Sequence, residues 1–181
     1  SFARGRAEVE YGGNDGSLAW YVAGSAFRED GWREFSPSEV GQLYVKLSRQ
    51  SARTKLDLSL NHADSALVGN GLAPESMIAG GRERVFSHPD ETRNHLTQVA
   101  LQGELWLSDL TSLSGNVYHR RTRSSTLNGD ISDEYEDDYE SWLDAGSPPE
   151  DAPHTGVNNR THTLQRTSGG ALQWNLRGDR H

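Results

Sequence analysis

The residues best suited to bind a ligand cluster between positions 130 and 144. Eight carboxylates fall in this stretch: Asp130, Asp133, Glu134, Glu136, Asp137, Asp138, Glu140 and Asp144. Carboxylate oxygens bind hard cations such as Ca²⁺, but the stretch lacks the ligand spacing and the glycine of an EF-hand loop. A charge run of this kind is typical of a solvated loop. No metal site is therefore predicted here, and the role of the acidic segment 130–144 stays open.

Aromatic rings interleave with these carboxylates, and two arginines precede them in an earlier loop. Tyr135, Tyr139 and Trp142 could stack on aromatic or chelating groups of a ligand, or pack the loop onto its neighbours. Arg82 and Arg84 could pair with an anionic chelate, although arginine is also common on surfaces. These five side chains are the candidate ligand-binding residues.

Catalytic signals are missing from the sequence. The seven histidines show no H-E-x-x-H or other metal-ligand spacing. There is no G-x-S-x-G element, phosphate-binding loop or dinucleotide fingerprint. The net charge of −8 argues against a nucleic-acid partner, because phosphate binding requires clustered Lys and Arg. The sequence predicts no enzyme, no metal and no cofactor.

The elements that must position the candidate residues are strands. In residues 4–11, Gly, Ala, Val and Tyr alternate with Arg and Glu, which predicts a strand with one apolar and one charged face. The same alternation returns along the chain and predicts seven strands, at about 2–12, 18–27, 40–49, 54–64, 95–107, 111–125 and 161–176. A short helix is predicted within 74–84. No run of about 18 apolar residues exists, so no transmembrane helix is predicted.

The predicted links between the strands alternate in length. Short links at 12–16, 50–53 and 108–110 alternate with longer ones at 28–39, 65–94 and 127–160. Outer-membrane barrels have short periplasmic turns and long extracellular loops, and a tilted strand of roughly 9–11 residues crosses a bilayer. The pattern therefore favours a membrane barrel.

The alternation also assigns faces to the side chains of this barrel. One set shares a face with the leucine rows and is expected to contact lipid: Ala7, Val9, Tyr11, Trp20 and Trp174. The other set lies among polar neighbours and is expected to face the lumen: Arg6, Glu8, Glu10, Tyr44, Trp106 and Tyr118. Trp and Tyr are enriched at the membrane interfaces of such barrels.

Several motifs resemble those of TonB-dependent outer-membrane receptors. The early-barrel motifs are Ala19-Trp20-Tyr21-Val22-Ala23-Gly24, Arg28-Glu29-Asp30-Gly31-Trp32-Arg33 and Ser36-Pro37-Ser38. The later ones are Gly69-Asn70-Gly71, Pro74-Glu75, Val85-Phe86, Pro89-Asp90, Thr92-Arg93-Asn94 and Leu113-Ser114-Gly115-Asn116-Val117-Tyr118. The resemblance covers most of the chain, but each motif marks the family and not a chemistry.

This resemblance implies an all-β fold, an antiparallel up-and-down meander of about seven strands from a 22-stranded transmembrane β-barrel, the size class of plugged outer-membrane transporters. Residues 1–181 would form part of the barrel without the plug domain and the C-terminal strands, and 2–12 would be its second strand. The loops at about 65–94 and 127–160 would be extracellular.

The same resemblance implies a location and partners. The intact parent would lie in the bacterial outer membrane as a monomer. It would contact outer-membrane lipid, bind a small-molecule ligand such as a ferric siderophore, and be driven by the TonB complex acting through the plug. Cobalamin, haem and glycans are alternative ligands.

Two other classes stay open at this point. One is a passive porin-type channel, which needs no plug. The other is a soluble antiparallel β protein used for binding, in which the leucine rows form a sandwich core. Seven strands cannot close a large barrel, and unpaired edge groups are not tolerated in lipid. We therefore expect these residues not to fold stably without the rest of a barrel.

Overall fold

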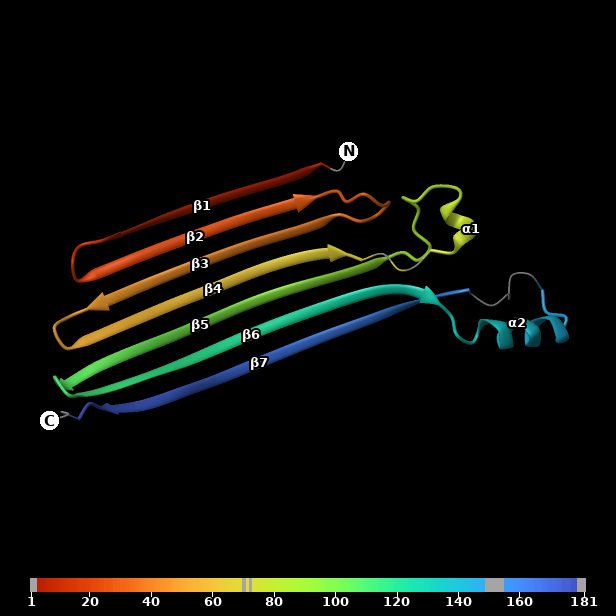
Figure 1. Ribbon diagram of the computed structural model, residues 1–181. Coiled ribbons are helices and arrows are strands. Elements are labelled where there is room, and N and C mark those ends of the chain that lie inside the picture. The colour runs from red at the N-terminus through yellow and green to blue at the C-terminus, as the bar shows by residue number, and fades with distance from the viewer. Residues whose placement is uncertain (1–2, 70, 72, 149–154, 179–181) are drawn as a thin grey trace.

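The computed structural model describes residues 3–69, 71, 73–148 and 155–178. The chain forms one antiparallel sheet whose strands neighbour one another in sequence order (Figure 1). The strands are β1 (Arg4–Asn14), β2 (Leu18–Glu29), β3 (Ser38–Gln50), β4 (Thr54–Val68), β5 (Asp90–Ser108), β6 (Thr111–Ile131) and β7 (Gly156–Leu176). The predicted all-β up-and-down meander of seven strands is confirmed.

The strand register gathers the apolar residues on one face of the sheet. One register row crosses β1 to β5 through Tyr11, Val22, Val45, Leu60 and Val99. The neighbouring row on the opposite face passes through Glu10, Ala23, Tyr44, Asn61 and Gln98. We call these two sides the apolar face and the polar face. Side chains alternate between the faces of a strand, so the register follows directly from the two-residue period of the sequence.

The predicted partition of aromatic residues between the faces is confirmed. Trp20 pairs with Leu47 and Trp174 pairs with Leu113, so both tryptophans lie on the apolar face. Tyr118 pairs with Ala100, and Trp106 pairs with Ser112, which places both on the polar face with Tyr44.

No second layer covers the apolar face in the part of the chain that the structure describes. None of the described hydrophobic side chains is buried, and Val9, Leu172 and Trp174 are 71%, 77% and 73% exposed. Within the described residues, the leucine rows therefore do not form a sandwich core. The sheet is held by its hydrogen-bond ladder and by contacts between neighbouring side chains on each face.

The apolar run shifts along the strands from one edge of the sheet to the other. On β1 it lies at 7–11, and on β7 it lies at 172–176. The register row through Val9 does not reach this β7 run; it passes through Gly24, Leu43, His62, Thr97 and Arg121 to Arg166. The apolar band therefore runs obliquely to the register rows.

The connections alternate in length and lie at opposite ends of the sheet (Figure 1). Residues 15–17, 51–53 and 109–110 form tight turns at one end, and residues 30–37, 69–89 and 132–155 form the connections at the other. The last two begin later and end earlier than predicted, because β4 to β7 continue past the apolar run. Ladder pairs such as Glu91 with Leu127 and Leu127 with Arg160 hold these extensions.

Two helices lie in the long connections. α1 (Glu75–Ile78) falls within the predicted helical stretch at 74–84. α2 (Tyr135–Asp144) was not predicted, although Tyr135, Tyr139 and Trp142 have the i, i+4, i+7 spacing of a helix face.

Neither helix is long and apolar enough to cross a membrane, within the residues described.

The first prediction concerns Gly115, where β6 and β7 lie close together. A Cβ at Gly115 would lie 2.7 Å from the main-chain oxygen of Ala171 and 3.2 Å from Leu172 Cδ1. We expect Gly115→Ala to force these strands apart and to lower the free energy of unfolding by about 1–3 kcal/mol. The midpoint of denaturant unfolding of the intact parent receptor measures this.

The matched control is Gly41→Ala on β3, on the same face. A Cβ at Gly41 meets no atom within 4 Å, and alanine loses less backbone entropy than glycine on folding. This variant should unfold at or above the midpoint of the unsubstituted protein. Equal midpoints for the two variants would contradict the close approach at Gly115.

Candidate ligand-binding site

Arg33 ties the first long connection to the second. Its guanidinium donates hydrogen bonds to the main-chain oxygens of Gly71 at 3.1 Å and Arg84 at 2.9 Å. The main-chain N–H of Glu34 donates to the Glu83 oxygen at 2.8 Å. The segment 30–37 therefore fixes the position of residues 71–84, which carry the candidate arginines.

The loop around Arg33 is itself fixed by Ser36 and Gly31. The Ser36 hydroxyl accepts from the Arg33 N–H at 3.2 Å and donates to the Arg33 oxygen at 2.6 Å. Gly31 has φ of 79°, and a Cβ there would lie 2.1 Å from Ser36 Oγ. Only glycine suits this backbone. Both residues lie in the receptor-like motifs of the sequence, where no local pattern indicates these contacts.

A hollow of about 560 Å³ lies where the second and third long connections meet the sheet. Its lining includes the rings of Phe86, His88 and Tyr135, the polar side chains of Asp130 and Asn158, and the apolar side chain of Val157. The His88 ring stacks on Phe35 with centroids 4.3 Å apart, which places the first long connection beside the hollow. All three long connections thus contribute to this region.

Gly129 lets the second connection lie directly against β6. Its N–H donates to the Pro89 oxygen at 2.5 Å. A Cβ at Gly129 would lie 2.9 Å from main-chain atoms of His88, so a side chain there would push the 86–89 segment off the strand. The wall of the hollow depends on this glycine.

The three candidate aromatic residues come together on α2. The Tyr135 and Tyr139 ring centroids lie 5.6 Å apart, and those of Tyr139 and Trp142 lie 5.5 Å apart. The indole N–H of Trp142 donates to the Pro148 oxygen at 3.1 Å. The rings therefore form a continuous row along one helix face, and Tyr135, at the end nearest the sheet, lines the hollow.

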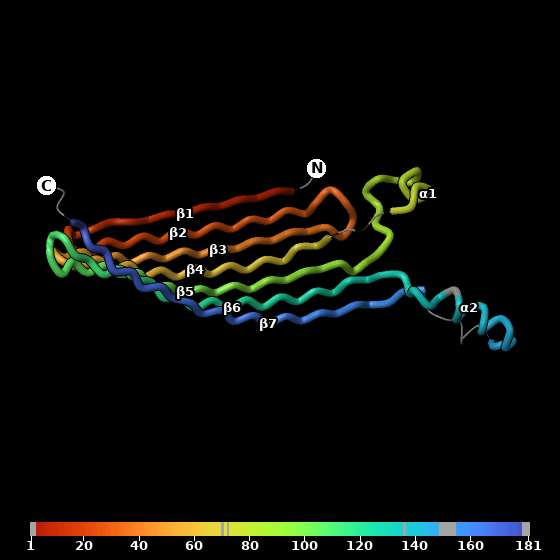
Figure 2. The backbone as a smooth tube through the Cα atoms, turned by 60° about the horizontal axis from the view of Figure 1, so that its bottom comes forward, coloured from red at the N-terminus to blue at the C-terminus, as the bar shows by residue number. Residues whose placement is uncertain are grey.

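The two candidate arginines lie apart from this row. Arg82 and Arg84 are exposed on the connection between α1 and β5, and neither lines the hollow. Figures 1 and 2 both show α1 and α2 on separate projections of the long-loop end. The structure thus joins the three aromatic residues and does not join the arginines to them.

Among the residues that are described, no three His, Asp or Glu side chains come close enough to hold a metal ion. The acidic residues of 130–144 that the structure describes follow the turns of α2 and its flanks, with no shared ligand cage.

Comparison with known proteins gives a match in structure only. No protein-family model matches the sequence, and no curated protein matches it. The structure is similar to two crystal structures of the ferric-catecholate import receptor Fiu of E. coli K12.

The closed form of Fiu aligns with a TM-score of 0.55 and 14% identity over 92% of this chain. The open form aligns with a TM-score of 0.54 and 16% identity over 96%. The chain spans about a quarter of the length of these receptors, 25% and 28%. At this identity the likeness concerns the fold: the seven-stranded antiparallel meander matches about a quarter of each receptor structure.

The Arg33 contacts make a second prediction. Arg33→Ala removes two hydrogen bonds from a charged donor to the 71–84 segment, so this segment should open more often. In the intact parent receptor, trypsin should then cleave after Arg82 and Arg84 about tenfold faster, as measured by mass spectrometry of timed digests.

Arg28→Ala is the matched control, because Arg28 lies at the same end of the sheet and its ion pair among the described residues is with Glu39, at 3.4 Å. Its cleavage rate at the two sites should equal that of the unsubstituted protein. Equal rates in the Arg33 and Arg28 variants would show that Arg33 does not hold the segment.

Proposed function

We propose that this chain is part of the β-barrel of a TonB-dependent outer-membrane receptor that takes up a ferric siderophore. The observation that carries the proposal is the single-layer sheet with an uncovered apolar face, in a fold that matches an import receptor for ferric catecholates. The chemistry is ligand binding and gated passage, and no bond is made or broken.

The exposure of the apolar face supports a lipid environment. Leucine and valine side chains repeat on every strand of this face. Many of them, together with Trp174, are at least 40% exposed: Val9, Leu43, Leu47, Leu56, Leu58, Val99, Leu101, Leu105, Val117, Leu172 and Trp174. A continuous exposed apolar surface is unfavourable in water but suits a bilayer. In the proposed orientation the polar face lines the lumen, and the tight turns lie in the periplasm.

This orientation places the long connections outside the cell, where a dilute ligand arrives. The aromatic row of α2 and the hollow at its base then face the incoming chelate. Catechol rings can stack on tyrosine and tryptophan in offset or tilted geometry. Arg82 and Arg84 offer charge to an anionic chelate from the neighbouring connection.

A third prediction tests the aromatic row. In the intact parent receptor, Tyr135→Ala and Tyr139→Ala should each raise the Kd for a ferric catecholate about three- to tenfold, because each removes an aromatic contact. Fluorescence titration with a ferric tris-catecholate complex measures this, and growth on that complex as the sole iron source measures its effect in cells.

Ser141→Ala serves as the control, because Ser141 lies on α2 away from the aromatic row. Its Kd should remain unchanged. If the tyrosine variants bind as tightly as the serine variant, the row takes no part in recognition.

A fourth prediction separates energised uptake from passive diffusion. Cells that express the intact parent should lose uptake of the radiolabelled ferric complex when TonB is deleted, while binding at the cell surface is retained. Uptake that persists without TonB would indicate a porin-type channel instead.

A further inference from the structure

We propose that Arg121, Arg123 and Arg166 form a binding site for the phosphate group of an anionic membrane lipid. We call these residues the cationic patch. The inference rests on the membrane placement proposed above and adds a specific lipid contact to it.

The patch lies on the apolar face, beyond the end of the apolar run. Arg121 and Arg123 follow Val117 on the same side of β6, and Arg166 directly opposes Arg121 on β7. Arg121 is separated from Val117 by four residues, roughly 13 Å along a strand. On a barrel in a bilayer, this position is at the level of the lipid headgroups.

Two like charges face each other in the patch without a compensating acid. Directly opposed like charges destabilise a strand pair. The register places no Asp or Glu on this face of β6 or β7, and no described acidic group forms an ion pair with any of the three arginines. Arg121 Nε is buried and has no hydrogen-bond partner among the described residues. The patch therefore lacks an anion.

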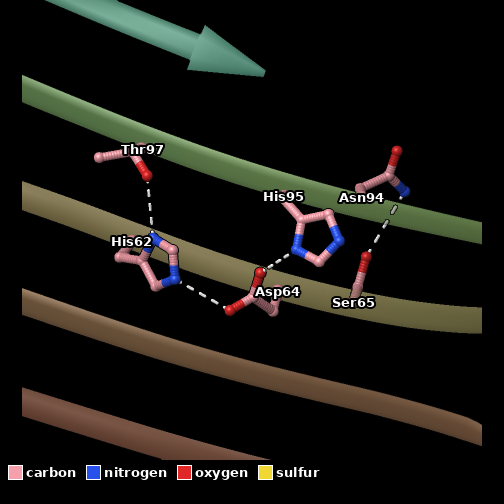
Figure 3. Close-up of polar contacts among 6 residues, drawn as sticks. All are labelled: His62, Asp64, Ser65, Asn94, His95 and Thr97. Atoms are coloured by element: carbon pink, nitrogen blue, oxygen red, sulfur yellow. Dashed lines mark hydrogen bonds and ion pairs between the residues drawn. The ribbon is translucent and has the colours of Figure 1, made fainter. Parts of the chain in front are cut away.

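The nearest carboxylate on this face is already engaged. Asp64 on β4 accepts a hydrogen bond from His62 at 2.9 Å and another from His95 (Figure 3). His62 also contacts the Thr97 hydroxyl at 2.9 Å. Figure 3 shows that the two imidazoles approach Asp64 from different sides. One carboxylate oxygen of Asp64 therefore bonds His62 on β4, and the other bonds His95 on β5. His95, which pairs in register with Arg123, stands between this carboxylate and the patch.

A groove on the same face gives the lipid chain a place beneath its headgroup. The groove has a volume of about 390 Å³ and is lined by Leu56, Gly103, Leu105, Leu113, Gly115 and Leu172. Gly103 and Gly115 pair in register and have no side chains, so the groove is deepest over them, and the leucine side chains form its apolar walls. Its upper edge includes Val117, so it ends below the patch. A lipid whose phosphate contacts the cationic patch would have its acyl chain in the groove beneath. Guanidinium groups bind phosphate with paired hydrogen bonds.

Two other arginines on this face are neutralised within the sheet. Arg93 pairs with Glu91 at 2.6 Å, and Arg28 pairs with Glu39 at 3.4 Å. They lie on the same face and provide a charge-matched comparison.

The test uses the intact parent receptor, delipidated in detergent and mixed with equal amounts of phosphatidylglycerol and phosphatidylcholine. Native mass spectrometry counts the lipid that is retained. Phosphatidylglycerol should be preferred. Arg121→Gln with Arg166→Gln should weaken its retention about twenty-five-fold, at about fivefold per arginine, and the exposed Arg166→Gln alone about fivefold.

The control Arg28→Gln with Arg93→Gln removes the same charge and should keep the preference. Equal retention of both lipids, or an equal loss in the control, would overturn the patch while leaving the membrane placement intact. Displacement of the lipid by an equal concentration of glycerol phosphate would assign the patch to a soluble phosphate and overturn the lipid proposal. Retention of neither lipid would overturn the membrane placement itself.

Discussion

The hydrogen-bond ladder of the sheet is the constraint on which the rest of the structure depends. A single layer has no packed interior, so every strand must satisfy its main-chain groups through its neighbours. The five inner strands do this on both sides, and β1 and β7 each pair on one side, in antiparallel register with one shift between Trp106 and Ser108. Once the register is set, the period of two assigns each side chain to a face, and a slip of one residue would exchange the faces.

The ladder also supports the long-loop end. β4 to β7 extend past the apolar run, so the connections they carry begin well beyond it. Contacts between connections then complete the arrangement, chiefly the Arg33 hydrogen bonds and the stacking of His88 on Phe35. The hollow beside Tyr135 is thus positioned by rigid strands below and by loop contacts above, as is common for binding sites.

The strands, the alternation of short and long links, and the assignment of side chains to the two faces could be predicted from the sequence alone, because they depend on local alternation. The prediction began β5 too late and ended β6 too early, since the outer parts of these strands are mostly polar and carry little of that signal. It also missed α2, whose aromatic spacing was visible but lay within a run of carboxylates. The role of Arg33 was beyond reach, because its acceptors are main-chain oxygens 38 and 51 residues away. The separation of Arg82 and Arg84 from the aromatic row likewise depends on where two loops lie in space.

The oblique course of the apolar run across the sheet has a geometric consequence. The register row through Val9, the centre of the run on β1, meets β7 at Arg166, whereas the centre of the β7 run is Trp174, eight residues further along (174 − 166). Eight residues span roughly 26 Å along a strand, and the six strand spacings from β1 to β7 span roughly 29 Å. The angle with this ratio is roughly 40°, which falls in the range of strand tilt in outer-membrane barrels. Under the proposed membrane placement, the positions of leucines and valines along the chain thus set the inclination of the strands to the bilayer.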